Sequence, residues 1–112
     1  MTAKKIYLQP AAIVQSAMLD LMDSQGGREI RRENRELEFG IAMFATEWTL
    51  RFSVSDIDRN RCAASLAIME PKDQSGELAC SLLRREYAML DAMLLIGTPL
   101  EATYDANGEV AI

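Results

Sequence analysis

A switch in hydrophobic parity constrains the fold more than any other feature of this sequence. The hydrophobic positions are odd-numbered from Leu37 to Met43 and even-numbered from Trp48 to Val54, with small or polar residues between them. Since successive side chains of a strand point to opposite faces, the switch predicts a hairpin turn at residues 44–47, or a bulge in one long strand. A third alternating segment, residues 61–68, follows the turn-forming sequence of residues 56–60. Such short connections predict an antiparallel meander.

Helical patterns lie on both sides of these strands. Residues 10–24 repeat hydrophobic residues at helical spacing, with Pro10 in the first turn and two glycines just beyond the end. A second helix is predicted over residues 76–96, and it spans roughly 30 Å at 1.5 Å per residue, enough to cross the whole sheet. The predicted fold class is therefore α+β: a helix, an antiparallel meander of three to four strands, and a long C-terminal helix packed across the sheet.

The length of 112 residues predicts one α+β domain over residues 1–97, followed by a C-terminal tail over residues 98–112. The tail contains the hairpin dipeptide Asn107-Gly108, so it either forms a small hairpin or is disordered. Between the first helix and the meander, residues 28–36 mix arginine with glutamate. We expect this segment to be a short exposed edge strand rather than a further helical turn, and a solvated face rather than a basic patch.

Charge and composition exclude several classes of function. The net charge of −5 has the wrong sign for a nucleic-acid partner, and the absence of histidine removes histidine-based catalysis and histidine metal sites. The two cysteines, Cys62 and Cys80, form no CxxC motif and lie among apolar residues, where cysteine behaves as a small hydrophobe. We expect no metal, no cofactor, no membrane span and a cytoplasmic location.

The predicted C-terminal helix has a polar stripe and a hydrophobic stripe. The polar positions are Glu77, Ser81, Arg84, Ala88 and Asp91, and the hydrophobic positions are Ala79, Leu82, Leu83, Met89, Leu90 and Met93. Glu86 falls in the middle of the hydrophobic stripe, where an ionised carboxylate is costly unless it is paired. One hypothesis is that Glu86 lines a cavity with a raised pKa and orients a ligand that bears an amine or a hydroxyl. The alternative is that it pairs with an arginine of residues 28–35 or reaches the rim.

Large hydrophobic side chains are expected on the inward face of the sheet and the helix. Met43 and Phe52 lie on the strands, and Met89 and Met93 lie on the hydrophobic stripe of the helix. Methionine fills core gaps and adaptable ligand surfaces equally well, so these residues fit an ordinary core or a ligand-binding surface. Trp48 lies near a strand end, where its indole N–H can reach water or a ligand at a cavity mouth.

The opposite face of the predicted sheet carries mainly small side chains. The residues of this face are Gly40, Ala42, Phe44, Ala63, Ser65, Ala67 and Met69, and five of the seven are small. Such a face is too apolar to be fully exposed to water, so we expect another layer to cover it. If both helices lie on the inner face, the cover is a second subunit of a homodimer; the alternative is one helix on each face.

The order of these segments resembles a known fold. The segments that carry the resemblance are the strand from Glu47 to Ser55, the turn of residues 56–60, the strand from Arg61 to Ile68 and the helix from Leu78 to Ile96. Together they resemble a truncated helix-grip domain of the START-like and polyketide-cyclase-like superfamily. The resemblance implies a hydrophobic cavity between the sheet and the long helix, with a lipid-like or polycyclic ligand, and it carries over no site residues.

We therefore expect a non-catalytic, cytoplasmic binding module for a small apolar ligand held between helix and sheet. The predicted ligand-binding residues are Glu86, Trp48, Met43, Phe52, Met89 and Met93. The alternative is a homodimeric, acidic protein-interaction or chaperone-like module without a small-molecule ligand. An enzyme that uses Glu86 for acid–base chemistry is the third hypothesis, and the sequence contains no phosphate-binding loop or nucleophile motif that favours it.

Overall fold

The computed structural model describes residues 1–72, 76–95, 103–104 and 109–111. In chain order the elements are β1 (Thr2–Tyr7), α1 (Ala11–Ser24), β2 (Arg28–Glu33), β3 (Glu36–Met43), β4 (Thr46–Asp58), β5 (Arg61–Glu70), α2 (Glu77–Met93), β6 (Thr103–Tyr104) and β7 (Glu109–Ala111). The described strands belong to one sheet, and both helices pack on it.

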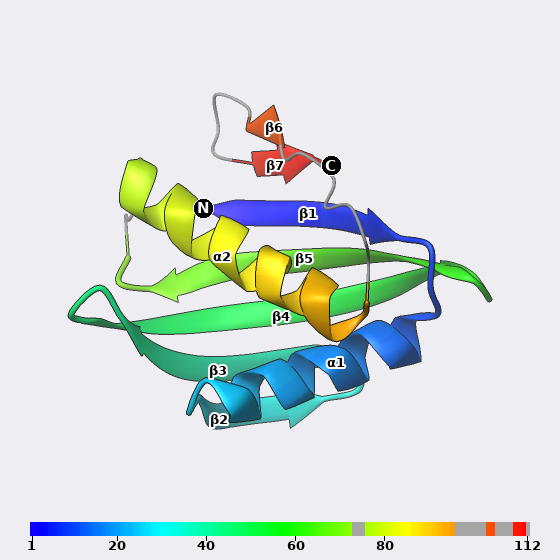
Figure 1. Ribbon diagram of the computed structural model, residues 1–112, viewed down its shortest axis with the longest axis horizontal. Coiled ribbons are helices and arrows are strands. Elements are labelled where there is room, and N and C mark those ends of the chain that lie inside the picture. The colour runs from blue at the N-terminus through cyan, green and yellow to red at the C-terminus, as the bar shows by residue number, and fades with distance from the viewer. Residues whose placement is uncertain (73–75, 96–102, 105–108, 112) are drawn as a thin grey trace.

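The sheet has the strand order β2-β3-β4-β5-β1-β7-β6 (Figure 1). Strands β2 to β5 are consecutive antiparallel neighbours, which confirms the predicted meander. β1 comes from the start of the chain and pairs antiparallel with β5, while β7 pairs parallel with β1 and antiparallel with β6. The dipeptide Asn107-Gly108 lies outside the described residues.

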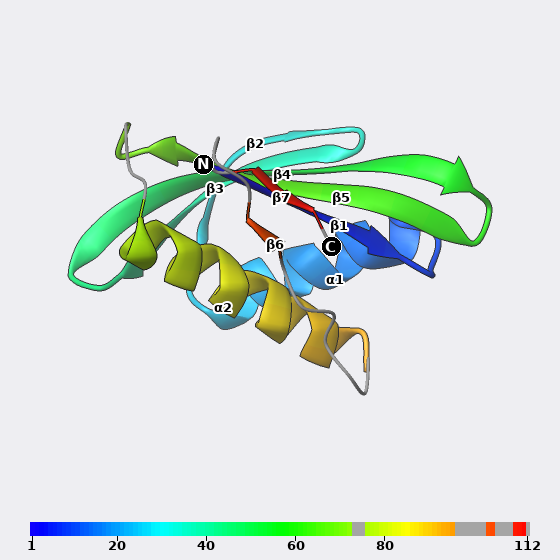
Figure 2. The same ribbon diagram turned by 90° about the horizontal axis from the view of Figure 1, so that it is seen from above.

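Both helices lie on the same face of the sheet, as the view from above in Figure 2 shows. α2 crosses the sheet, and α1 runs beside it. The hydrophobic core consists of the inner face of the strands and the facing stripes of the two helices. The α+β fold class is confirmed, and neither helix covers the other face of the sheet, which we call the outer face.

The parity switch in the sequence is a two-residue hairpin. Met43 pairs with Thr46, and the two residues between them, Phe44 and Ala45, have φ values of 55° and 57°. Two successive positive φ values match the twist of the flanking strands, which is why short hairpins adopt this turn. The inward residues of β3 and β4 therefore point to the same face of the sheet. Trp48, the first of them on β4, is 1% exposed.

Helix α1 agrees with its sequence pattern at both ends. It begins after Pro10, and the chain leaves it through Gly26, whose φ of 69° favours glycine. A β carbon on Gly27 would lie 2.7 Å from Cγ of Met22, so this position also requires glycine. The chain then turns directly into β2, which is the edge strand that the sequence predicts.

The polar stripe predicted for α2 is wrong at Asp91, which is 2% exposed. The reason is strand β1, which is not predicted from the sequence and which lies beneath the end of this helix. Lys5 on β1 is 3% exposed and donates a hydrogen bond to Asp91, and the Tyr7 hydroxyl donates one of 2.8 Å to the other carboxylate oxygen. The Tyr87 hydroxyl donates a further bond of 2.8 Å to the carbonyl of Ala3, so α2 is tied to β1 at two levels.

The Lys5–Asp91 ion pair predicts a large stability loss on removal of one charge. Asp91→Asn leaves the Lys5 ammonium buried without a counter-ion, which costs about 3–5 kcal/mol in free energy of unfolding. Urea denaturation monitored by circular dichroism measures this loss. Asp20→Asn, at an exposed position of α1, is the matched control and changes the free energy by less than about 0.5 kcal/mol. Equal effects of the two substitutions would contradict the assignment.

Candidate functional site

The strongest candidate for a functional group is Glu86, in the middle of α2. Its side chain is 0% exposed, as its place in the hydrophobic stripe predicts. Leu82, Leu83 and Leu90, one turn before and one turn after it, are also fully buried. The carboxyl group therefore lies among hydrophobic side chains, where only a specific hydrogen bond offsets the loss of hydration.

That hydrogen bond comes from the end of α1. The side-chain amide of Gln25 donates to Oε1 of Glu86 over 2.7 Å. The other carboxyl oxygen, Oε2, and the amide oxygen of Gln25 are buried and have no hydrogen-bond partner among the described residues. The partner of Glu86 is thus Gln25 and not an arginine of residues 28–35. Next to the hydrogen bond between them, each side chain has one oxygen acceptor without a donor.

Gln25 is not among the site residues predicted from the sequence, although its spacing contains a signal. Gln25 follows the buried residues Met18, Leu21 and Met22 at helical spacing, so it continues the hydrophobic stripe of α1. It is also the C-terminal cap residue of this helix, and its backbone N–H bonds to the Leu21 carbonyl. The glycine turn that follows holds the amide at the helix end, where it meets α2.

Burial raises the pKa of Glu86 above the ordinary glutamate value, and the Gln25 hydrogen bond and the nearby charge of Arg85 oppose this effect in part. The protonated carboxylic acid can donate as well as accept a hydrogen bond, whereas the carboxylate can only accept. The amide oxygen of Gln25 is an acceptor in both protonation states of Glu86, so the Glu86–Gln25 pair can bind a group that carries a hydrogen-bond donor, such as an amine or a hydroxyl.

The aromatic residues predicted for the site lie in the core. Phe52 and Trp48 are each 1% exposed and pack within the hydrophobic cluster. The Trp48 indole N–H donates a 2.9 Å hydrogen bond to the carbonyl of Met43, across the hairpin. This bond gives the indole N–H a partner within the chain and holds the ring beneath the hairpin.

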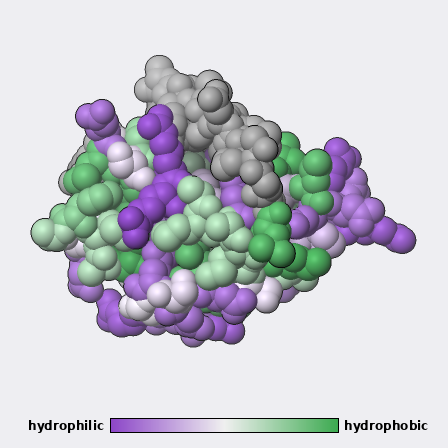
Figure 3. All heavy atoms as spheres, viewed as in Figure 1, coloured by the Kyte–Doolittle hydropathy of each residue, from purple (hydrophilic) through white to green (hydrophobic). Residues whose placement is uncertain are grey.

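The three methionines predicted for the site occupy different environments. Met43 and Met89 are partly buried and pack against the core. Met93 is the last residue of α2 and is 41% exposed, although the sequence predicts it in the hydrophobic stripe. It lines a groove of about 330 Å³ between α1 and the end of α2, together with Ile13 and Leu95. In Figure 3 hydrophobic residues gather where α2 ends and α1 begins, whereas hydrophilic residues follow the exposed stripe of α2.

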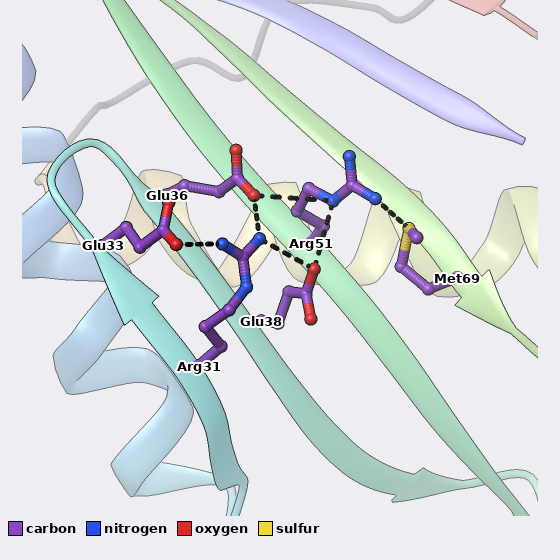
Figure 4. Close-up of polar contacts among 6 residues, drawn as sticks. All are labelled: Arg31, Glu33, Glu36, Glu38, Arg51 and Met69. Carbon is purple, nitrogen blue, oxygen red and sulfur yellow. Dashed lines mark hydrogen bonds and ion pairs between the residues drawn. The ribbon is translucent and has the colours of Figure 1, made fainter.

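The outer face of the sheet carries a polar cluster, and three of its residues belong to the segment 28–36 that the sequence predicts to be a solvated face. In Figure 4 Arg31, from β2, reaches three glutamates, Glu33, Glu36 and Glu38, and its contacts with Glu33 and Glu38 measure 2.5 and 3.0 Å. Arg51, from β4, lies 3.5 Å from Glu38. The hydrogen bonds from Arg31 lower the pKa of Glu38. All five side chains lie at the surface, and their contacts join β2, β3 and β4 across the sheet.

Beside this cluster the outer face is hollow. A groove of about 510 Å³ lies over β4 and β5, and its walls include Lys4 and Ile6 of β1. Its floor consists of small residues, Ser53, Ala63 and Ser65 among them. Small side chains on two adjacent strands explain the hollow, since larger side chains flank them on both sides.

The described part of the chain lacks two other kinds of site. Within it, no three cysteine, aspartate or glutamate side chains lie close enough to hold a metal ion. No helix among the described residues is both long and apolar enough to cross a membrane.

Two solved structures are similar to most of this chain. One is a START superfamily protein from Mycobacterium smegmatis, with 12% identity, a TM-score of 0.44 and coverage of 84% of this chain and 92% of that one. Another is the di-domain ARO/CYC StfQ from the steffimycin biosynthetic pathway, with 11% identity, a TM-score of 0.43 and coverage of 84% of this chain and 43% of that one. These similarities concern the fold alone. Comparisons with protein-family models and with curated proteins found no match.

The raised pKa of Glu86 predicts a pH dependence of stability. A carboxyl group whose pKa is higher in the folded than in the unfolded state stabilises the fold at low pH. This contribution is lost as the pH rises from the unfolded value, about 4.3, through the folded value. Glu86→Gln cannot titrate, so its free energy of unfolding rises relative to that of the wild type between pH 5 and pH 8. Urea denaturation at both pH values measures the difference.

The matched control for this experiment is Glu77→Gln, at an exposed position in the first turn of α2. The gain relative to the wild type between the two pH values must be larger for Glu86→Gln than for this control. A gain of equal size would show that the buried position has no special role in the pH dependence.

Proposed function

We propose that this chain is a binding module for a small, largely apolar molecule that carries a hydrogen-bond donor. The molecule enters between α2 and the inner face of the sheet, and its donor reaches the Glu86–Gln25 pair. The single observation that supports this proposal is the pair of buried acceptors, Oε2 of Glu86 and the amide oxygen of Gln25, which have no partner among the described residues. Because a buried acceptor without a donor costs about 1–3 kcal/mol, a ligand that supplies the donor recovers that energy on binding.

The surroundings of the pair support an apolar ligand. The hydrophobic cluster supplies a surface against which hydrocarbon is stable, with Trp48 and Phe52 as its large rigid members. Met43 and Met89 lie at the edge of this cluster and are only partly buried. Methionine side chains rearrange at low cost, so we assign to these two the movement that admits the ligand. Met93 belongs to the surface groove and is assigned to its entrance.

The proposed function is binding and not catalysis. Glu86 is the one titratable group in the pair, and its described hydrogen-bond partner is an uncharged amide. Acid–base catalysis by two groups, or activation of a nucleophile, needs a second reactive side chain in contact with the first. We further propose a cytoplasmic location, which the thiol of Cys62, present without a disulfide, supports.

The test uses two probes with the same hydrocarbon chain. Decan-1-ol carries a hydroxyl donor, and decyl methyl ether does not. A ligand that binds only the folded state raises the melting temperature in proportion to the logarithm of its concentration over Kd. We expect decan-1-ol to raise the melting temperature of the wild type more than the ether does. Native mass spectrometry of gently purified protein gives a second readout, an added mass of bound ligand.

The matched variants are Glu86→Leu and Glu77→Leu, which remove a glutamate from the buried and the exposed positions of the same helix. Glu86→Leu abolishes the preference for the alcohol over the ether, and Glu77→Leu retains it. The proposal is overturned if Glu86→Leu raises the melting temperature while neither probe binds the wild type and no added mass is found. In that case the glutamate is a defect of an ordinary core.

A further inference from the structure

The hydrogen bond between Gln25 and Glu86 has an acceptor without a donor on each side of it. The bond joins Nε2 of Gln25 to Oε1 of Glu86 over 2.7 Å, and the two buried acceptors are the other oxygens of the same two groups. Each acceptor lies about 2.2 Å from the bonded atom of its own planar group, so the two acceptors are at most about 7 Å apart. To satisfy both, a ligand must supply at least two donors within this small space.

A primary ammonium group has enough donors for both acceptors, and a hydroxyl has enough for one. An ammonium has three N–H donors on one atom, whereas a hydroxyl has a single O–H donor. With N–H···O bonds of about 2.9 Å, one nitrogen can donate to two acceptors that are about 5 Å apart, which lies within the limit set by the pair. The number of donors therefore favours an amine over an alcohol.

The charge around Glu86 also favours a cation. The described hydrogen-bond partner of Glu86 is an uncharged amide, whereas Asp91, the other buried acid of α2, is paired with Lys5. Arg85 is a charged neighbour whose field reaches Glu86, but its side chain is exposed, so solvent screens its charge. A positive group on the ligand stabilises the carboxylate, whose two oxygens both accept hydrogen bonds.

The groove that we assign to the entrance lies in line with the pair. Met93, which lines this groove, follows Glu86 by seven residues, which is about two turns along the same side of α2. Ile13 and Leu95 line the groove as well and are exposed. Hydrocarbon can therefore contact the protein from the surface groove to the buried pair.

The electrostatic character of this groove is negative. Asp20 is the charged residue among its described lining residues, and its carboxylate is exposed. The last carbonyls of α2 add partial negative charge, and the last turn of this helix has no basic residue. The positive end of α1 lies nine residues before Asp20, roughly 14 Å away, where a helix dipole has little effect. The groove thus attracts a molecule that is both cationic and hydrophobic.

We propose that the ligand of this chain is a primary alkylamine, bound as its ammonium ion. This inference rests on the proposed function and names the polar group of its ligand. The ammonium donates one N–H to Oε2 of Glu86 and another to the amide oxygen of Gln25, and the alkyl chain extends toward Met93. The net charge of −5 attracts the cation over a longer range.

The first experiment compares three probes with the same decyl chain by isothermal titration calorimetry at pH 7. Decylamine is then a cation with three N–H donors, since an alkyl ammonium resembles that of lysine, whose pKa is about 10.4. Decan-1-ol has one donor and no charge, and decyltrimethylammonium has the charge but no donor. We expect decylamine to bind at least about tenfold more tightly than either of the others, because charge-assisted hydrogen bonds are about twice as strong as neutral ones.

Matched variants test the two parts of the proposed route. Glu86→Gln keeps the size of the side chain but removes its charge, so the preference for decylamine over decan-1-ol disappears, whereas Glu77→Gln, at an exposed position of α2, retains it. Asp20→Asn raises the Kd of decylamine at least about twofold at low salt and leaves that of decan-1-ol unchanged. Its control is Asp23→Asn, at an exposed position of α1 outside the described lining of the groove, which has a smaller effect. Circular dichroism checks that all four variants fold.

The possible outcomes separate this inference from the proposed function. If decan-1-ol binds the wild type as tightly as decylamine does, the inference is overturned and the proposed function is retained. If decyltrimethylammonium binds as tightly as decylamine, charge alone causes binding, and the role of the two acceptors is overturned. Equal effects of Asp20→Asn and Asp23→Asn overturn the role of the groove. If none of the three probes binds, the proposed function fails together with the inference. The comparison of probes on the wild type remains decisive even if Glu86→Gln does not fold.

Discussion

The ion pair between Lys5 and Asp91 joins the first strand of the chain to its last long helix, and the rest of the core depends on this contact. Each charge is almost completely buried, so neither is tolerable without the other. Tyr7 occupies the second oxygen of Asp91, and its own pKa is raised by burial and by that negative charge. With β1 held in this way under α2, the inner face of the sheet is covered and Glu86 is enclosed.

Two acidic residues on the same helix illustrate how hydrogen bonding separates a structural group from a candidate binding group. Asp91 receives a donor on each of its carboxylate oxygens, one from Lys5 and one from Tyr7. Glu86 lies five residues earlier and receives one donor, from Gln25, on one oxygen. Both are buried to the same degree, so the difference lies in the partners and not in exposure. A complete set of donors stabilises the fold, whereas an incomplete set leaves an acceptor for another molecule.

The two faces of the sheet have different requirements because both helices lie on one of them. The hydrophobic residues of the inner face are covered by other parts of the same chain. Leu37, Leu50 and Leu66 are almost completely buried there. On the outer face, arginines and glutamates cover β2 and β3, while small residues leave β4 and β5 uncovered. The proposed ligand thus uses the face that the two helices cover.

The sequence by itself determined the meander, both helices and the place of Glu86 in the hydrophobic stripe, and it limited the parity switch at residues 44–47 to a hairpin or a bulge. These features follow from alternation and helical spacing, which are local and depend only on neighbours in the chain. It did not determine the role of Lys5, because two adjacent lysines obscure the alternation of β1, or that of Asp91, because the helix pattern assigns a charged residue to solvent. Only the tertiary structure paired Lys5 with Asp91 and Gln25 with Glu86. Each of these pairs joins residues more than 60 positions apart, and no local pattern specifies which distant donor reaches a buried acid.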